Sequence, residues 1–148
     1  MHNTMDARIA LDKIEIQELI ARYCRACDSK DWALLRTVFT EDAVLDYSSV
    51  KGPAGSREEV CGWLERGLST VPWTMHYVTN IEIDLDGDRA KVHVMFYNPM
   101  LLPGMADMSY CGGYYHHQVV RTAQGWKSAR LVEQNVWFKN HPSEHRPS

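Results

Sequence analysis

The chain is predicted to be an α+β protein in which three N-terminal helices pack against a curved antiparallel or mixed sheet. Apolar residues recur at helical spacing in the first part of the chain, and strand-like segments separated by turns fill the part after Pro72. A strongly bent sheet that carries helices on one face forms a cone, and its open end is a natural pocket. We therefore expect one domain over residues 1–148, with a flexible polar tail from about 140 to 148.

The first predicted helix covers about residues 7–27. Its apolar side chains form one stripe, made up of Ile9, Ile16, Leu19, Ile20, Tyr23 and Cys27. Either Ser29 or Asp31 can cap a second, short helix that holds Trp32, Leu34, Leu35 and Val38. A short strand is expected over residues 43–47. After a turn at residues 52–55, Ser56 begins a capping box that opens a third helix through Leu68.

The later part of the chain carries predicted strands over residues 71–85, 90–97, 110–122 and 126–138. Asp86-Gly87-Asp88 predicts a hairpin turn between the first two. Asn98-Pro99 is expected to break the second strand and to open a methionine-rich loop over residues 100–108. Because methionine adapts to irregular apolar shapes, this loop is either a lid over an apolar ligand or a subunit contact.

Composition excludes several classes of partner. A formal net charge of -3 and a pI near 6.1 provide no basic surface for nucleic acid. The N-terminal residues lack the apolar core of a signal peptide, and no apolar run is long enough to span a bilayer. We therefore expect a cytoplasmic protein with no nucleic-acid or membrane partner.

Metal and redox sites are also not expected. Cys24 and Cys27 form C-x-x-C, but the motif lies in a helical pattern, follows no strand and has no second cysteine pair, so two small buried residues explain it better than a redox or zinc site does. Adjacent strand residues such as His116 and His117 point to opposite faces and cannot share an ion. His93 has no acidic or histidine partner at helical or alternate-strand spacing. We predict no metal and no cofactor.

Asp28 and His76 are the first candidates for chemistry. Asp28 ends the first helix beside the apolar stripe, where the helix dipole disfavours a negative charge. It is therefore either a cap or partner of Lys30 or Arg25, or part of a site. His76 lies in a strand-like segment with apolar neighbours and is either a core histidine or a base. A carboxylate that holds one imidazole nitrogen leaves the other nitrogen free as a base.

Four further residues are candidates for substrate binding or catalysis. Tyr47 is either an aromatic at a sheet edge or a hydrogen-bond donor to a leaving oxygen. Tyr23 lies on the buried stripe of the first helix, and Asn98 is either a turn residue or a ligand contact. Tyr115 points opposite to its two neighbours, so one of the two faces of its strand is inside.

Three segments resemble scytalone dehydratase in order and spacing, namely residues 28–32 (DSKDW), 45–47 (LDY) and 74–77 (TMHY). The chain is also similar to bile acid 7α-dehydratase and to hexachlorocyclohexane dehydrochlorinase, on a pattern that includes Tyr23, Asp28, Tyr47 and His76. Residues 10–138 are thereby identified as a member of the SnoaL-like (NTF2-like) superfamily. The resemblance implies a cone-shaped α+β barrel with His76 as the general base, Asp28 as its orienting partner, Tyr47 on a substrate oxygen or leaving group and Tyr23 lining the cavity.

The same resemblance places Asn98 where the bile acid enzyme carries a catalytic carboxylate, and Tyr115 where scytalone dehydratase carries a substrate-contacting amide. The chain also departs from these enzymes. Cys27 replaces a tyrosine, and His93 lies several residues too early to be the second histidine of scytalone dehydratase. The pocket arginine of the dehydrochlorinase falls one position from Arg130. The base is retained, while the groups that assist it have changed.

These observations lead to three hypotheses. The first is a cofactor-independent lyase, a dehydratase that acts by general acid–base catalysis on a small apolar cyclic substrate such as a polyketide or steroid. The second is a ketosteroid-type isomerase or polyketide cyclase with the same base. The third is a binding module without chemistry. A homo-oligomer, either a dimer or a trimer, is expected because the superfamily usually assembles through the outer face of its sheet.

Overall fold

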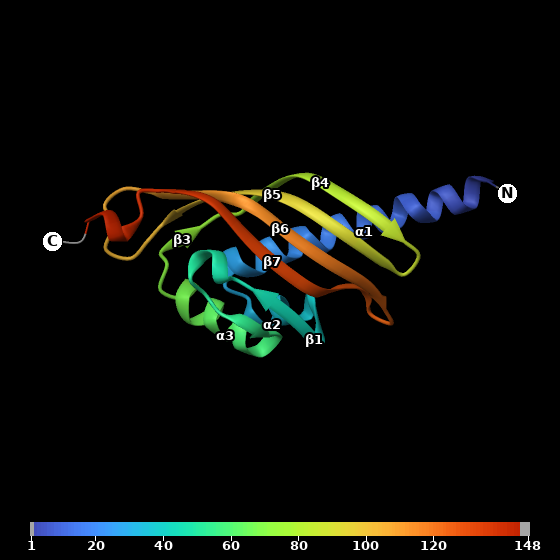
Figure 1. The fold of residues 1–148 in the computed structure, drawn as a ribbon, viewed down its shortest axis with the longest axis horizontal. Coiled ribbons are helices and arrows are strands. Elements are labelled where there is room, and N and C mark those ends of the chain that lie inside the picture. The colour runs from blue at the N-terminus through green and yellow to red at the C-terminus, as the bar shows by residue number, and fades with distance from the viewer. Residues whose placement is uncertain (1, 146–148) are drawn as a thin grey trace.

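The computed structural model describes residues 2–145 and has helices on one side of a long, curled sheet (Figure 1). The helices are α1 (His2–Ser29), α2 (Trp32–Thr37) and α3 (Arg57–Leu68), with 3-10 turns at Ser48–Val50 and Pro142–His145. The strands are β1 (Phe39–Asp46), β2 (Ala54–Ser56), β3 (Trp73–Thr74), β4 (Tyr77–Asp86), β5 (Arg89–Leu101), β6 (Ser109–Thr122) and β7 (Gly125–Lys139). This arrangement confirms the predicted α+β class.

The sheet is mixed rather than purely antiparallel. Its strand order is β2-β1-β7-β6-β5-β3, with β4 also paired to β5. Only the pairing of β1 with β7 is parallel among the strand pairs described, and the rest are antiparallel. Shifts of register interrupt the β6–β7 ladder near Gly113, where a Cβ atom would lie 1.9 Å from the backbone oxygen of Gln134. Such irregularities bend strands, which curls the sheet around its inner face.

The core lies between α1 and the inner face of the sheet. Residues of the predicted stripe from Ile16 onwards are buried, whereas Ile9 is 42% exposed. The N-terminal end of α1 runs out past the β4–β5 hairpin (Figure 1). Alternate residues of β5, such as Val92 and Val94, are buried beneath the helix. The core therefore forms from one apolar face of α1 and one apolar face of the sheet.

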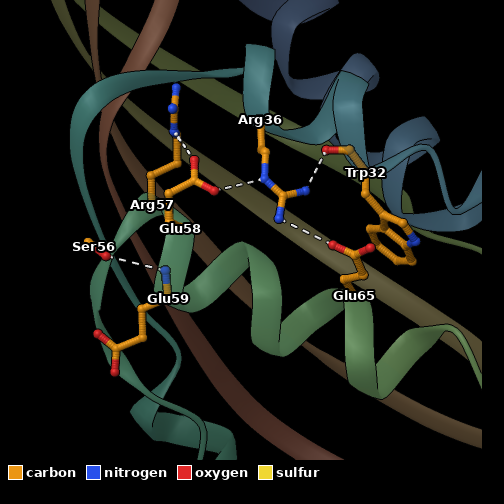
Figure 2. Close-up of polar contacts among 7 residues, drawn as sticks. All are labelled: Trp32, Arg36, Ser56, Arg57, Glu58, Glu59 and Glu65. Carbon is orange, nitrogen blue, oxygen red and sulfur yellow. Dashed lines mark hydrogen bonds and ion pairs between the residues drawn. The ribbon is translucent and has the colours of Figure 1, made fainter.

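The helix caps agree with the local sequence. Of the two candidates for α2, Asp31 is the cap, since its carboxylate accepts a hydrogen bond from the backbone N–H of Leu34 at 3.0 Å. Ser29 instead donates to the carbonyl of Arg25. The predicted cap of α3 is also confirmed, because the hydroxyl of Ser56 accepts from the N–H of Glu59 at 3.2 Å (Figure 2).

Arg36 joins the two short helices. Its guanidinium donates to Glu58 at 3.0 Å and to Glu65 at 3.2 Å, both on α3, and to the carbonyl of Trp32 at 3.1 Å (Figure 2). A single partly exposed ion pair contributes little to the free energy of folding. A planar guanidinium that donates to three acceptors at once nevertheless restrains the angle between the two helices. The α2–α3 pair is thereby held as a unit beside β1.

The expected break of β5 at Asn98-Pro99 is wrong. The strand continues to Leu101, and Pro99 lies opposite Tyr110 of β6. The proline is tolerated because the pairing of β4 with β5 ends at Tyr97 and the pairing of β3 with β5 covers only Met100 and Leu101. Pro99 lies between the two ladders, where its missing N–H costs no ladder hydrogen bond on that edge of β5. Its carbonyl still accepts a hydrogen bond from Met75 N–H at 3.1 Å. The methionine-rich loop is correspondingly shorter, because Met100 belongs to the strand and is buried.

The C-terminal segment was expected to be a flexible tail from about residue 140. In the part that the structure describes, β7 ends at Lys139 and a 3-10 turn covers Pro142–His145. Residues 146–148 of that expectation lie outside the described residues. No helix within residues 2–145 is long and apolar enough to cross a membrane.

Candidate active site

The end of α1 places Asp28. Lys30 adopts a left-handed conformation with φ 57°, and the backbone N–H groups of Lys30 and Asp31 donate back to the carbonyls of Cys27 and Ala26. This pair of bonds closes the helix in a Schellman motif, with Asp28 in its last turn. The Lys30 ammonium then donates to the carbonyl of Val71 at 2.8 Å, which ties the helix end to the segment just before β3. Asp28 therefore faces the chain that carries His76.

His76 lies between β3 and β4 rather than inside a continuous strand. Its backbone N–H donates to Oδ2 of Asp28 at 2.9 Å, and its ring nitrogen Nδ1 lies 2.5 Å from Oδ1 of the same carboxylate. The side chain of His76 is 7% exposed and that of Asp28 is 23% exposed. One carboxylate thus holds both the backbone and the ring of the histidine. The alternatives in which Asp28 pairs with Lys30 or Arg25 do not occur.

Asn98 occupies the other nitrogen of the His76 ring. The side-chain amide of Asn98 lies 3.0 Å from Nε2 of His76. The amide nitrogen of Asn98 faces the carbonyls of Pro99 and Met75 at 3.1 and 3.2 Å and the hydroxyl of Thr74 at 2.8 Å, because carbonyl oxygens can only accept. The amide oxygen therefore faces Nε2 of His76 at 3.0 Å, and it accepts a hydrogen bond when that nitrogen carries a proton.

This contact corrects the expectation that the second imidazole nitrogen would be free. Both nitrogens of His76 therefore have an oxygen neighbour, the carboxylate of Asp28 at Nδ1 and the amide oxygen of Asn98 at Nε2. Asn98 is also not a turn residue, since it is buried on the inner face of β5.

Tyr47 and Tyr23 form a second polar group inside the fold. Tyr47 directly follows β1 and is 5% exposed, which rules out the half-exposed position at a sheet edge. Its hydroxyl is hydrogen-bonded to that of Tyr23, which is buried on α1. Burial raises the pKa of both phenols well above the ordinary value, so both keep their protons at neutral pH. Among the described residues no hydrogen bond joins this pair to His76.

Tyr115 resolves the question of which face of β6 is inside. Its ring packs edge-on against Tyr23 at 5.3 Å and stacks on Phe96 at 4.5 Å between ring centres, and it is almost completely buried. Its neighbours Tyr114 and His116 therefore lie on the outer face. Tyr115 thus lies beside Tyr23 and, through it, next to the tyrosine pair.

Two inward-facing polar residues were missed by the sequence analysis. His117 follows Tyr115 by two positions, so both share the inner face of β6. It is buried, its Nδ1 contacts the hydroxyl of Ser128 at 2.9 Å, and its Nε2 has no hydrogen-bond partner among the described residues. Burial is the main reason that the pKa of His117 falls to about 3. Glu133 is likewise buried, and burial raises its pKa. Strand alternation from Tyr115 and Leu131 was the signal that could have found both.

The two cysteines of the C-x-x-C pair are buried in the core. Cys24 and Cys27 lie on α1 as free thiols, and burial raises the pKa of Cys24 to about 12. Within the described part of the chain, no group of three or more histidine, cysteine or acidic side chains is arranged around a common point. The sequence-based prediction of no cofactor stays a prediction.

Known proteins share both the sequence pattern and the fold of this chain. The family model for the SnoaL-like domain matches residues 8–132. Uncharacterized proteins from Mycobacterium tuberculosis (Rv2910c) and Mycobacterium bovis (Mb2934c) are each 35% identical over 129 residues, covering 86% of this chain and 88% of theirs.

Several solved structures have a similar fold. The Kfla4162 protein from Kribbella flavida is 27% identical with a TM-score of 0.81, over 89% of this chain and 95% of that one. A candidate scytalone dehydratase from Novosphingobium aromaticivorans is 22% identical with a TM-score of 0.81, over 95% and 92% of the two chains. A hexachlorocyclohexane dehydrochlorinase (LinA type 2) is 17% identical with a TM-score of 0.79, over 90% and 91%. From the family model and the mycobacterial relatives together, the chain belongs to the SnoaL-like domain family, of NTF2-like fold.

Proposed function

We propose that this protein is a cofactor-independent lyase, a dehydratase that acts by general acid–base catalysis on a small apolar cyclic substrate such as a polyketide or steroid. The observation that carries the proposal is the double hold of Asp28 on His76, through the backbone N–H and through Nδ1. A carboxylate on Nδ1 makes Nε2 the nitrogen that can take a proton, as general base catalysis requires.

In the proposed reaction, Nε2 of His76 removes a proton from the carbon next to a carbonyl. The electron pair forms a carbon–carbon double bond, and the bond to the neighbouring hydroxyl breaks. That hydroxyl takes a proton from Tyr47, either directly or through water, and leaves as water. Tyr23 supports this step, because its hydroxyl is hydrogen-bonded to that of Tyr47 and can donate to the Tyr47 oxygen as that oxygen gains negative charge. The proton taken by His76 then returns to Tyr47 through water when the product leaves.

Asn98 has a specific part in this scheme. Proton abstraction turns His76 into an imidazolium, which then presents an N–H to Asp28 and another to the amide oxygen of Asn98. The carboxylate of Asp28, and the amide oxygen of Asn98 once it returns to Nε2, favour the ring as it gains charge. Before the reaction, the substrate takes the place of the Asn98 oxygen at Nε2. Asn98 is therefore a positioning residue whose contact with the ring strengthens as the proton moves.

The setting also supports acid–base chemistry. The ring of His76 and both phenols are nearly enclosed, and hydrogen bonds are stronger where water is excluded. Membership of the SnoaL-like family agrees with a small-molecule site. Two structural neighbours carry names of elimination enzymes, a candidate scytalone dehydratase and a hexachlorocyclohexane dehydrochlorinase, and elimination is the reaction class proposed for this chain.

The test uses a panel of apolar cyclic β-hydroxy ketones, with loss of water followed by the absorbance of the enone. We expect the wild-type protein to dehydrate at least one compound and His76→Ala to lower kcat by roughly 10²–10⁴. His141→Ala is the matched control, because this histidine is exposed and lies beyond β7. Binding without turnover, or equal rates in wild type and His76→Ala, would refute the proposal. Deuterium uptake from heavy water without loss of water would instead identify an isomerase or cyclase.

A further inference from the structure

Two histidines meet on the outer face of the sheet, away from the dyad. His93 of β5 and His116 of β6 are direct cross-strand partners. Their Nδ1 atoms lie 3.3 Å apart, and their ring centres are separated by 4.9 Å. Both rings are partly buried. Their separation of 23 positions in the chain hid this pair from a search by local spacing.

A neighbouring side chain contacts each histidine ring and leaves the Nδ1 atoms of the two rings facing each other. Nε2 of His116 lies 2.8 Å from the side-chain oxygen of Gln134, so Nε2 carries the proton and Nδ1 carries the lone pair. His93 stacks on Tyr114 with ring centres 4.8 Å apart and an interplanar angle of 29°. A carbonyl on the remote nitrogen is the arrangement that orients and polarises histidines at metal centres.

We propose that His93 and His116 form a binding site for a divalent metal ion of tetrahedral preference, with zinc as the probe ion. Zinc–nitrogen bonds of 2.0–2.1 Å at a tetrahedral angle place two ligand nitrogens about 3.3–3.4 Å apart, whereas a right angle places them about 2.9 Å apart. The observed 3.3 Å matches the tetrahedral value. Without metal, the two nitrogens share one proton. On metal binding, that proton moves to Nε2 of His93, and both Nδ1 lone pairs bind the ion.

Glu82 is the side chain placed to complete the site. It is the cross-strand partner of His93 on β4, and it is exposed. Facing residues on adjacent strands are close enough for an extended carboxylate to reach the ligand nitrogens once the side chain rotates. Glu82 and both histidines line a groove of about 560 Å³, where Glu82 and Asp84 offset the charges of Lys91 and Arg130. Water would fill the fourth position.

The site is independent of the proposed dehydratase chemistry, because His93 lies on the outer face of β5 and Asn98 on the inner face. The experiment is a calorimetric titration of the full-length protein with zinc chloride at a pH where imidazole is neutral, in a buffer that does not bind zinc. We expect one zinc ion per chain. His93→Ala and His116→Ala should each weaken zinc binding by at least about tenfold, and Gln134→Leu by roughly tenfold.

Two controls keep the result interpretable. His141→Ala removes an exposed histidine from another part of the chain and should bind zinc as the wild type does. Circular dichroism checks that each variant is folded, and zinc should raise the Tm of the wild type but not of the double variant His93→Ala/His116→Ala. Absence of saturable binding by the wild type would overturn the proposal. So would binding that survives in the double variant, which would identify an adventitious site elsewhere.

Discussion

Asp28→Asn tests the centre of the proposed chemistry without changing side-chain shape. In the wild type, both carboxylate oxygens accept, one from the backbone N–H of His76 and the other from the ring. An amide has only one oxygen. The backbone N–H can never accept, so the amide oxygen introduced at position 28 must face it, and the amide NH₂ must face Nδ1. The neutral ring is then forced to carry its proton on Nε2, which removes the base.

The size of the effect follows from the charge-assisted hydrogen bond to the ring, which a neutral one replaces in the variant. A hydrogen bond to a charged group contributes about 1.5–3 kcal/mol, and one of the two on Asp28 is retained in the variant. We therefore expect the free energy of unfolding to fall by no more than about 3 kcal/mol. A base with the wrong tautomer is far more damaging to turnover, and kcat should fall by roughly 10²–10⁴.

Two-bond ¹H–¹⁵N correlation spectra of the histidine rings give a readout that needs no substrate. We expect the neutral His76 ring to be protonated at Nδ1 in the wild type and at Nε2 in Asp28→Asn. Asp31→Asn is the matched control, since Asp31 caps α2 and asparagine caps equally well. If the ring of Asp28→Asn keeps its proton on Nδ1, then the carboxylate does not orient the imidazole and the reasoning fails.

Two predictions concern stability. Because burial lowers the pKa of His117 to about 3 from 6.5, the unfolded chain binds one more proton between these pH values, and the free energy of unfolding falls by about 1.4 kcal/mol per pH unit on acidification. Urea unfolding across this range should show a shallower pH dependence in His117→Gln, and equal slopes would contradict the assignment. Tyr23→Phe should cost about 1–3 kcal/mol, because it leaves the buried hydroxyl of Tyr47 without its phenol partner. Adding Tyr47→Phe should recover part of that loss in thermal unfolding, whereas a fully additive further loss would count against a coupled pair.

Features determined by neighbouring residues could be predicted. Ser56 caps α3 through the backbone N–H group three residues ahead, so the cap and its target lie in the same short segment. For α2 the sequence left Ser29 and Asp31 as alternatives, and the structure shows Asp31 as the cap. The hairpin at Asp86-Gly87-Asp88 depends on Gly87, whose φ of 59° suits glycine. By contrast, β5 continues through Pro99 because other strands leave a gap in the ladder there, and no local rule contains that information.

The candidate site divides in the same way. Asp28, His76 and Tyr47 became candidates through motif order and spacing. Strand alternation showed that Tyr115 points opposite to its two neighbours. Alternation places His117 and Glu133 on the same faces as Tyr115 and Leu131, but it shows that these faces are inside only once one of those two residues is known to be buried.

The sequence by itself predicted the α+β class and the Ser56 cap of α3, because periodicity and capping act over a few residues, and it gave Asp28 and His76 as candidate partners. Only the tertiary structure decided that Asn98 covers the second nitrogen of His76 and that His93 faces His116. Both contacts depend on how strands far apart in the chain are aligned. That alignment is set by bulges and by burial of a common core, and a shift of one residue would turn every side chain to the opposite face.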